Sequence, residues 1–331
     1  MGLRKFNGII SDMRIFITGA TGFAGSFLVE QLLADGHELF VLVHDATSHQ
    51  ALPVHDRIQP IIGDLLDSSS IKKVVADVRP NLIYHLAGQA SPVVSWQNPA
   101  LTLAVNSGGT ANVLEAAVAA SHPRVVVVTS AEIYGVVSAE MLPLTEQTLP
   151  QPRHPYGISK AAASQLASVY WQRYELPVIE ARPFNHIGPR QALGFVVPDF
   201  ASQLAAIKLG WKSPAISVGN LEAKRDFTDV RDVARAYIAL AKNGQPGEAY
   251  FICSGKAVSI YSLLQTMIDL AQVKVQITFD PARMRPSDMP TLMGSYAKIE
   301  QDTGWRPQIS LQQSLVDTLD YWLEKLQDGQ K

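Results

Sequence analysis

Residues 14–33, RIFITGATGFAGSFLVEQLL, join a short apolar run to three closely spaced glycines and a second apolar segment of different period. The run at residues 15–17 is typical of an interior strand of a parallel sheet, which is buried on both faces. After the glycines, apolar residues recur at helical spacing, namely Phe27, Leu28, Leu32 and Leu33. The first turn of a helix presents unpaired backbone N–H groups and the positive end of the helix dipole. The stretch therefore predicts a dinucleotide site, against the alternative of a tight turn without a ligand.

The composition indicates a globular chain of balanced charge. The 331 residues are 47% hydrophobic, and 28 Lys and Arg residues stand against 30 Asp and Glu residues. No overall charge recruits nucleic acid or an anionic membrane, and no apolar run approaches the roughly 20 residues of a membrane span. The first residues lack the apolar core of a secretory signal, so we expect a cytoplasmic protein. We expect the single cysteine, Cys253, to be a small core residue rather than a nucleophile.

Predicted strands alternate with predicted helices, which favours an α/β fold of the Rossmann type: a doubly wound parallel sheet with ligands at the carboxyl ends of its strands. Residues 1–13 are expected to form an N-terminal extension. Residues 14–184 should be mainly the NAD(P)-binding domain, and residues 185–331 mainly a smaller α/β substrate domain interwoven with the first. The pattern also predicts one long helix from about residue 100 to 120, a helix over 198–209, and a capping box formed by Ser310 and Gln313.

The end of the second predicted strand bears on the choice of dinucleotide. In many dinucleotide-binding folds an acidic residue there holds the ribose 2′-hydroxyl, but Val43 and His44 stand at this place. Asp45 comes later, on the turn. His44, followed by Thr47 and Ser48, can tolerate a 2′-phosphate, so the sequence favours NADP over NAD.

Two other strand ends carry residues that suit a cofactor. Asp64 follows a weak strand and either accepts a hydrogen bond from the adenine amino group or caps the next helix. Ala87 and Gly88 follow the strand at 81–86 and allow close approach of a cofactor. His85 has no partner at metal-ligand spacing, so we expect a core histidine and no metal site.

The residues that predict chemistry are Tyr156 and Lys160, which lie four positions apart at the start of an alanine-rich helix and therefore share one face. An ammonium close to a phenol favours the phenolate, so we expect Lys160 to lower the pKa of Tyr156 toward neutrality. Ser130 follows the strand at 124–128 and is expected to reach the same oxygen. A Tyr-x-x-x-Lys pair alone is a weak signal, but beside a nucleotide turn and a serine at a strand end it predicts an acid–base site.

The motifs GATGFAG (19–25), SAEIYG (130–135) and YGISK (156–160) resemble those of the extended short-chain dehydrogenase/reductase family that acts on nucleotide sugars. The resemblance implies that Tyr156 is the general acid or base, that Lys160 tunes it and holds the nicotinamide ribose, and that Ser130 bonds the sugar oxygen. Glu132 is a further catalytic candidate. The candidate cofactor contacts are Gly19, Thr21, Gly22, Phe23, Ala24, Gly25, His44, Asp64, Leu65, Leu86, Ala87, Gly88, Tyr156, Lys160, Phe184 and His186.

The second half of the chain indicates the substrate. Asn185 comes after the predicted strand at 177–181, and the resemblance implies that it contacts the substrate diphosphate or sugar, as does Ser130. Arg225 and Arg285 are candidates to neutralise that diphosphate, because a guanidinium binds two phosphate oxygens at once. The alternative is surface ion pairing of these arginines with Asp226 and Asp288; Asp288 is also a candidate substrate contact.

The segments ARPFNHIGPRQ, GNLEAKRDFTDVRD and RMRPSDMPTLMGS resemble a reductase branch of this family. The resemblance implies NAD(P)H-dependent reduction of the C4 ketone of GDP-4-keto-6-deoxy-D-mannose to GDP-D-rhamnose. It also implies a homodimer through the helices at about 100–120 and 156–174. Ala131 cannot act as an acid, which argues against the Asp-Glu arrangement common in sugar dehydratases. A GDP-mannose 4,6-dehydratase or another nucleotide-sugar epimerase or dehydratase stays open, as does a nicotinamide sensor without catalysis.

Overall fold

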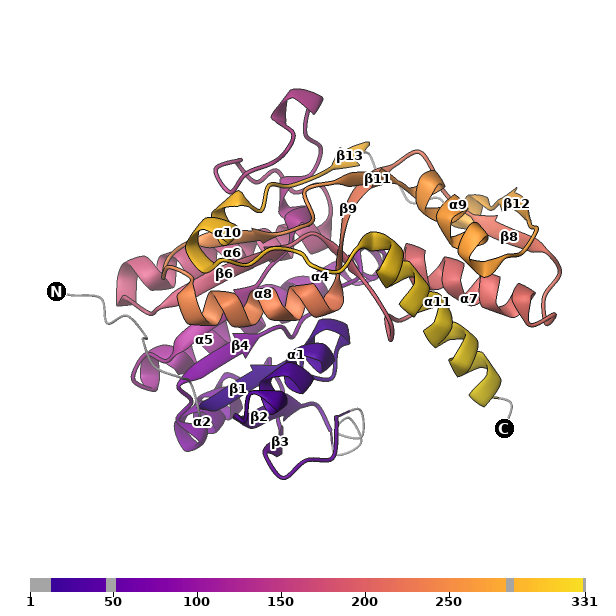
Figure 1. The fold of residues 1–331 in the computed structure, drawn as a ribbon. Coiled ribbons are helices and arrows are strands. Elements are labelled where there is room, and N and C mark those ends of the chain that lie inside the picture. The colour runs from indigo at the N-terminus through magenta and orange to yellow at the C-terminus, as the bar shows by residue number, and fades with distance from the viewer. Residues whose placement is uncertain (1–12, 46–51, 284–288, 330–331) are drawn as a thin grey trace.

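The structure is a computed structural model that describes residues 13–45, 52–283 and 289–329. The strands of its central sheet are Arg14–Thr18 (β1), Glu38–Val43 (β2), Ile58–Ile62 (β3), Leu82–His85 (β4), Arg124–Val128 (β5), Val178–Pro183 (β6) and Ala249–Ile252 (β10). They are all parallel and lie in the order β10-β6-β5-β4-β1-β2-β3 (Figure 1). The order runs outward from β1 in both directions, so the predicted doubly wound sheet is confirmed.

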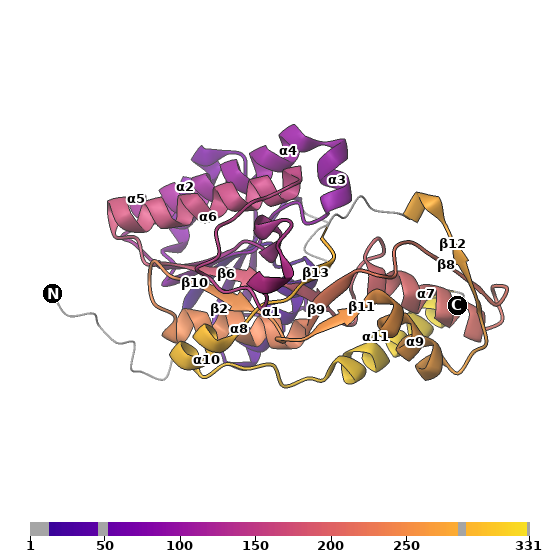
Figure 2. The same cartoon turned by 90° about the horizontal axis from the view of Figure 1, so that it is seen from above.

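Helices cover both faces of this sheet (Figure 2). One face packs on α1 (Phe23–Ala34), α8 (Val230–Asn243) and α10 (Ala297–Thr303), and the other on α2 (Ser68–Val78), α5 (Gly109–Ala119) and α6 (Pro155–Tyr174). Successive side chains of a strand point to opposite faces. Ile15 and Ile17 accordingly enter the first core, and Phe16 enters the second.

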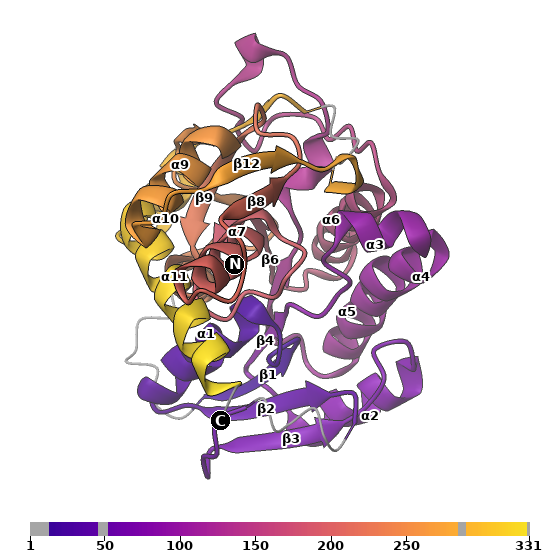
Figure 3. The same ribbon diagram turned by 90° about the vertical axis from the view of Figure 1, so that its right-hand side faces the viewer.

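The second half of the chain builds a separate core beside the carboxyl ends of the sheet (Figure 3). Its helices are α7 (Val196–Lys208), α9 (Ile260–Ala271) and α11 (Leu311–Asp328). Its strands are β7 (Asn185–Ile187), β8 (Ala215–Val218), β9 (Lys224–Asp229), β11 (Ala257–Ser259), β12 (Gln276–Phe279) and β13 (Thr291–Leu292). Yet α8 and β10 pack with the central sheet, although both follow residue 185. The domain bounds 14–184 and 185–331 stay a prediction. Cys253 is fully buried, as expected.

Three local predictions are corrected by the structure. The helix expected from about 100 to 120 is three segments: α4 (Pro99–Leu103), a π-helical turn at Ala104–Gly108, and α5. Helix α7 begins at Val196, before the predicted start. Ser310 caps α11 by accepting a hydrogen bond from the Gln313 backbone, but the Gln313 side chain donates to Asp317, so the reciprocal half of the capping box is not formed.

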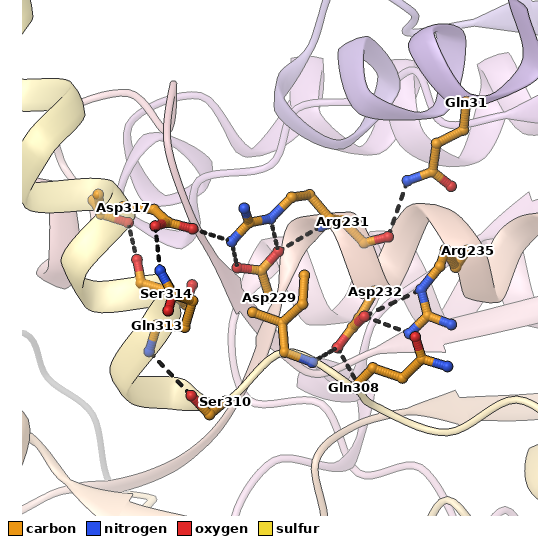
Figure 4. A network of polar contacts seen from close by, with 12 residues as sticks. Gln31, Asp229, Arg231, Asp232, Arg235, Gln308, Ser310, Gln313, Ser314 and Asp317 are labelled. Carbon is orange, nitrogen blue, oxygen red and sulfur yellow. Dashed lines mark hydrogen bonds and ion pairs between the residues drawn. The ribbon is translucent and has the colours of Figure 1, made fainter. Parts of the chain in front are cut away.

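A polar network at the first turn of α8 joins the core under α1 and α8 to the separate core that contains α11 (Figure 4). Arg231 donates to Asp229 on the preceding strand and to Asp317 on α11, with Nη2–Oδ2 distances of 2.7 and 2.6 Å. Its carbonyl accepts a hydrogen bond from Gln31 on α1. Asp232 is fully buried and accepts hydrogen bonds from Arg235 and from two backbone N–H groups of the segment before α11, those of Gln308 and Ile309.

Replacing Asp232 with alanine should lower the free energy of unfolding by about 3 kcal/mol or more, because two backbone N–H groups and a guanidinium lose their buried acceptor. Urea denaturation followed by circular dichroism measures the change. Asp320→Ala, an exposed position on α11, is the matched control and should change stability by less than about 0.5 kcal/mol. Equal losses in the two variants would contradict the assignment.

Candidate active site

Two positions of the glycine turn, Gly19 and Gly25, have no space for a side chain. Gly19 follows β1 with φ +78°, and a Cβ there would lie 2.5 Å from the Ala87 nitrogen. A Cβ on Gly25 would lie 2.1 Å from the Gly19 carbonyl oxygen. Gly22 is the N-cap of α1 without a side-chain cap, and the first turn of this helix carries no acidic residue. The open N–H groups of such a turn fit a diphosphate.

Buried hydrogen bonds lie beneath the turn. Thr18 Oγ1 is 2.7 Å from His85 Nδ1, and His85 Nε2 is 3.0 Å from Thr110 Oγ1. Thr110 in turn donates to the Asn106 carbonyl at 2.6 Å. Because Thr110 donates its proton there, His85 must donate from Nε2 and accept from Thr18 at Nδ1. His85 is thus a satisfied core histidine, as predicted, and burial lowers its pKa to about 3.

Asn106 is a site residue that our sequence analysis missed. It lies in the π-helical turn, accepts from the Gln89 N–H at 2.8 Å, and donates to Ser159 Oγ at 2.9 Å. It therefore ties the turn after β4 to the helix of Tyr156. The signal available in the sequence was a polar amide followed by the paired glycines 108 and 109 inside a predicted helix. Such a pattern can mark a π turn, and π turns are frequent at functional sites.

Two elements, β5 and α6, bring the predicted trio together. Ser130 follows β5, whereas Tyr156 and Lys160 lie on the first turns of α6, and all three are more than nine-tenths buried. Ser130 and Tyr156 share a side-chain hydrogen bond. The Lys160 ammonium donates to the carbonyl of Val128 at 2.9 Å. A proton donor, a second hydroxyl and a cation thus converge at the carboxyl ends of the strands.

The predicted effect of Lys160 on Tyr156 is wrong. Burial raises the pKa of Tyr156 to about 12, against the hydrogen bond with Ser130, and the nearby Glu132 carboxylate raises it further. Burial also lowers the pKa of Lys160 to about 8, which the charge of Glu180 partly opposes. Desolvation dominates because both groups are enclosed. Tyr156 is therefore a protonated phenol at neutral pH, and Lys160 is an ammonium.

A buried ion pair on β6, Arg182 with Glu180, packs against α6, the helix of Lys160. Arg182 donates to both carboxylate oxygens of Glu180 at 2.8 Å. Thr129 and Ser164 also donate to this carboxylate, at 2.6 and 3.0 Å. The residue after β5 and the middle of α6 are thus linked through one fully bonded charge pair, and full bonding is the condition under which buried charges are tolerated.

The other cofactor candidates line the same edge of the sheet. His44 is exposed at the end of β2, and Asp64 is exposed after β3. Asp64 accepts a hydrogen bond from Leu66, whereas Asp67 caps α2, so the alternative of Asp64 as helix cap is wrong. Thr47 and Ser48 lie outside the described residues, as do residues 1–12.

His186 and Phe184 differ in what they can offer a cofactor. The His186 ring stacks on Phe23, in the first turn of α1, with centroids 5.7 Å apart, and burial lowers its pKa. The Phe184 ring packs instead into a core with Phe251. Contact with a cofactor at position 184 would therefore come from the backbone rather than the ring.

Asn185 and Arg225 lie on the adjacent strands β7 and β9. The side-chain oxygen of Asn185 is buried with no hydrogen-bond partner within the described part of the chain. Arg225 donates to the Lys224 and Met289 carbonyls at 2.8 and 2.9 Å. Asp226, its suggested ion-pair partner, is fully buried and bonded by a separate set, Ser254 and the Gly255 and Gly294 backbone. Arg285 and Asp288 lie outside the described residues.

The described residues offer neither a metal site nor a membrane-spanning helix. Among residues 13–45, 52–283 and 289–329, no group of three or more His, Cys, Asp or Glu side chains is arranged to hold a metal ion. Over the same ranges, every helix is too short or too polar to cross a membrane.

Comparison with known proteins places this arrangement in a family. The family model described as GDP-mannose 4,6 dehydratase matches residues 16–318. The GDP-6-deoxy-D-mannose reductase of Pseudomonas aeruginosa is 37% identical over 95% of this chain and 99% of its own. The structure of RMD from Pseudomonas aeruginosa complexed with NADPH superposes with a TM-score of 0.82 at 34% identity, covering 95% of this chain and 99% of that one. The UDP-glucose 4-epimerase of Thermus thermophilus in complex with NAD gives 0.84 at 30% identity, covering 94% and 99%. The chain belongs to the extended short-chain dehydrogenase/reductase family, in the group that the GDP-mannose 4,6-dehydratase family model describes.

Proposed function

We propose that this protein reduces the C4 ketone of GDP-4-keto-6-deoxy-D-mannose with NADPH and releases GDP-D-rhamnose. The observation that carries the proposal is the buried Tyr156 hydroxyl, hydrogen-bonded to Ser130 and one helical turn from the Lys160 ammonium, beside an open diphosphate turn. The extent of the likeness to the Pseudomonas reductase, over nearly both full chains, supports this substrate class.

The side chains divide the reaction as follows. Bound NADPH supplies the hydride that reduces C4. Tyr156 donates its phenolic proton to the C4 oxygen as negative charge develops there, and Ser130 donates a second hydrogen bond to the same oxygen. Lys160 stabilises the phenolate that remains until solvent returns a proton. The raised pKa of Tyr156 suits this direction, because a protonated phenol is the form needed for reduction.

NADPH rather than NADH is the proposed cofactor. The end of β2 presents exposed His44 instead of a carboxylate that would repel a 2′-phosphate. The proposed contacts of its diphosphate are the N–H groups of the glycine turn. On the substrate side, Asn185 and Arg225 would contact the GDP-sugar, together with Arg285 and Asp288. The buried Asn185 amide oxygen, which has no hydrogen-bond partner among the described residues, fits a sugar hydroxyl.

Glu132 favours a second candidate function. A carboxylate near Tyr156 is the kind of group that a dehydratase needs to remove the proton next to the ketone, so GDP-mannose 4,6-dehydratase activity is the alternative. A dehydratase or epimerase regenerates its dinucleotide and shows no net consumption. A sensor without catalysis would have no need of Tyr156 or Lys160.

The deciding assay follows nicotinamide absorbance with purified protein and GDP-4-keto-6-deoxy-D-mannose, with NADPH and NADH in turn, and identifies the product by NMR. We expect stoichiometric oxidation and a preference for NADPH of about tenfold or more, as expected for a lost charge-assisted contact. Absence of oxidation with both dinucleotides would overturn the reductase assignment. Conversion of GDP-mannose without net oxidation would establish the alternative.

The pH dependence of this reduction follows from Lys160. Its pKa is about 8, so the ammonium is present below that pH and is lost as the pH rises through it. Tyr156 keeps its proton over the same range. We expect kcat/KM to be level near pH 7 and to fall above about pH 8. In Lys160→Arg, whose charge persists to above about pH 12, the activity will be lower, but the fall should vanish. A fall retained in that variant would assign it to another group.

We further propose a cytoplasmic homodimer that binds neither nucleic acid nor membrane. Apolar side chains are exposed on α4 and α6, with Leu101 55% and Val169 51% exposed, and exposed apolar residues of this kind are candidates for an interface. Val169→Asp should convert the dimer to monomer in light scattering. Leu149→Asp, in a loop where the leucine is 77% exposed, is the control. A wild-type monomer would refute the dimer.

A further inference from the structure

His154 makes two directional hydrogen bonds immediately before the catalytic helix. It is the N-cap of α6, and its Nδ1 accepts from the Gly157 N–H at 3.0 Å. A nitrogen that accepts an N–H carries no proton, so the proton of the neutral ring is on Nε2. Nε2 lies 3.0 Å from Oε2 of Glu132. The ring therefore donates to this carboxylate in the same tautomer that caps the helix.

These bonds close a ring of contacts around the reacting oxygen. Glu132 belongs to the short 3₁₀ helix Ala131–Tyr134, and its backbone N–H donates to Ser130 Oγ at 3.1 Å. Its carboxylate meets His154, which begins the helix of Tyr156. Tyr156 in turn bonds Ser130. The two hydroxyls of the site are thus held by one closed set of bonds that passes through His154.

The packing around this ring leaves little freedom. The rings of His154 and Tyr156 stack with centroids 6.0 Å apart and planes 6° apart. A Cβ on Gly157 would lie 2.7 Å from the Glu132 carbonyl oxygen, so α6 and the 3₁₀ helix touch through backbone. Pro155 occupies the first helical position, where its fixed φ suits the helix start. A tilt of the first turn would therefore move the Tyr156 hydroxyl directly.

We propose that His154 is a positioning residue: by capping α6 and holding the Glu132 carboxylate, it keeps the Tyr156 hydroxyl in line with Ser130. In this role Glu132 is a hydrogen-bond acceptor and does not itself move a substrate proton. The inference rests on the proposed reductase function and deepens it. It also gives a role to a carboxylate that lies beside the site of a reaction needing only one proton donor.

The kinetic test begins with two single variants and their double variant. Asparagine caps helices well but is too short to span Gly157 and Glu132, so His154→Asn keeps the cap while it removes the link to Glu132 and the ring that stacks on Tyr156. We expect kcat to fall about tenfold, with KM and the NADPH Kd within about twofold, because misplacement of a reacting group affects the chemical step. Glu132→Ala should match this loss, and the double variant should be no worse than either single one, as expected for a shared contact.

Glu132→Gln separates positioning from proton transfer. Its amide oxygen can still accept from Nε2, so this variant should retain several times the kcat of Glu132→Ala. His122→Asn is the control, because His122 is exposed with φ +57°, a conformation that asparagine tolerates. Equal losses in the Gln and Ala variants would make Glu132 an acid or base. Additive losses for His154→Asn and Glu132→Ala would remove the link. Either result overturns the proposal.

A readout independent of turnover tests the geometry. In protein labelled with ¹⁵N-histidine, with His154→Asn as the assignment reference, the ring nitrogens of His154 should show the Nε2–H tautomer. Finding the Nδ1–H tautomer would overturn the proposal even in an active enzyme. A wild-type protein that shows the expected tautomer but does not reduce the 4-keto sugar would instead refute the proposed function alone.

Discussion

Tyr156→Phe should reduce kcat for the 4-keto sugar by about a thousandfold, the range expected for loss of a general acid. The ring is retained, so its stacking on His154 and the packing of α6 should persist. Only the hydroxyl that bonds Ser130 is removed. Proton donation to the C4 oxygen would then have to come from Ser130 or water, neither of which has the support of the Lys160 ammonium. Steady-state nicotinamide absorbance measures the loss.

The controls make this result specific. The NADPH Kd of Tyr156→Phe, measured by fluorescence titration, should stay within about threefold, since most dinucleotide contacts lie elsewhere. Tyr174→Phe makes the same change at the last residue of α6, where the side chain is 46% exposed, and should retain wild-type kcat. A wild-type rate in Tyr156→Phe would remove this hydroxyl from the mechanism.

Gly25→Ala should weaken NADPH binding by about a hundredfold, because a displacement of about 1 Å at a binding site is enough for an effect of that size. The new Cβ would lie 2.1 Å from the Gly19 carbonyl oxygen and 2.8 Å from the Ala20 Cα. Both neighbours are backbone atoms and cannot rotate away. The start of α1 must therefore move from the turn whose N–H groups face the diphosphate. Overpacking should also lower the free energy of unfolding by about 1–3 kcal/mol.

Gly108→Ala is the matched control for this substitution. Gly108 has helical angles, φ −64° and ψ −44°, and nothing lies within 4 Å of a Cβ built there. Stability in Gly108→Ala should be unchanged or higher by up to about 1 kcal/mol, and NADPH binding should be unaffected. Isothermal titration calorimetry gives both Kd values. Wild-type affinity in Gly25→Ala would mean that the turn does not contact the dinucleotide.

Patterns set by local chemistry were predictable from the sequence. The glycines at 19–25 marked the strand-to-helix turn because side chains are excluded there. Ser130 lies where the parallel strands end, and helical spacing places Tyr156 and Lys160 together on the first turns of α6. Effects that depend on enclosure were not predictable. Four-residue spacing placed Lys160 and Tyr156 on one face of the helix but could not show that burial raises the pKa of the phenol.

Contacts between segments far apart in sequence account for the remaining misses. No sequence pattern near His154 predicts that Glu132, 22 residues earlier, lies within hydrogen-bond distance of its ring. Asn106 gains its meaning from Gln89 and Ser159, which belong to different elements. Gln313 fits a capping box by spacing, yet its amide bonds Asp317 on the next turn of the same helix. In each case the chain offers a polar group several partners, and tertiary packing selects one.

Strand β10 has a consequence for how this protein is made. β10 is the last strand of the central sheet to be synthesised. Until Ala249–Ile252 leaves the ribosome, the outer edge of β6 has no neighbour, although the other six strands of the sheet are complete. An unpaired strand edge recruits foreign strands. The nascent chain therefore exposes this unpaired edge of β6 while the elements from β7 to α8 are being translated. A termination or pause in that interval would yield aggregating fragments rather than a free nucleotide-binding domain, which makes this stretch the point where chaperone protection matters most.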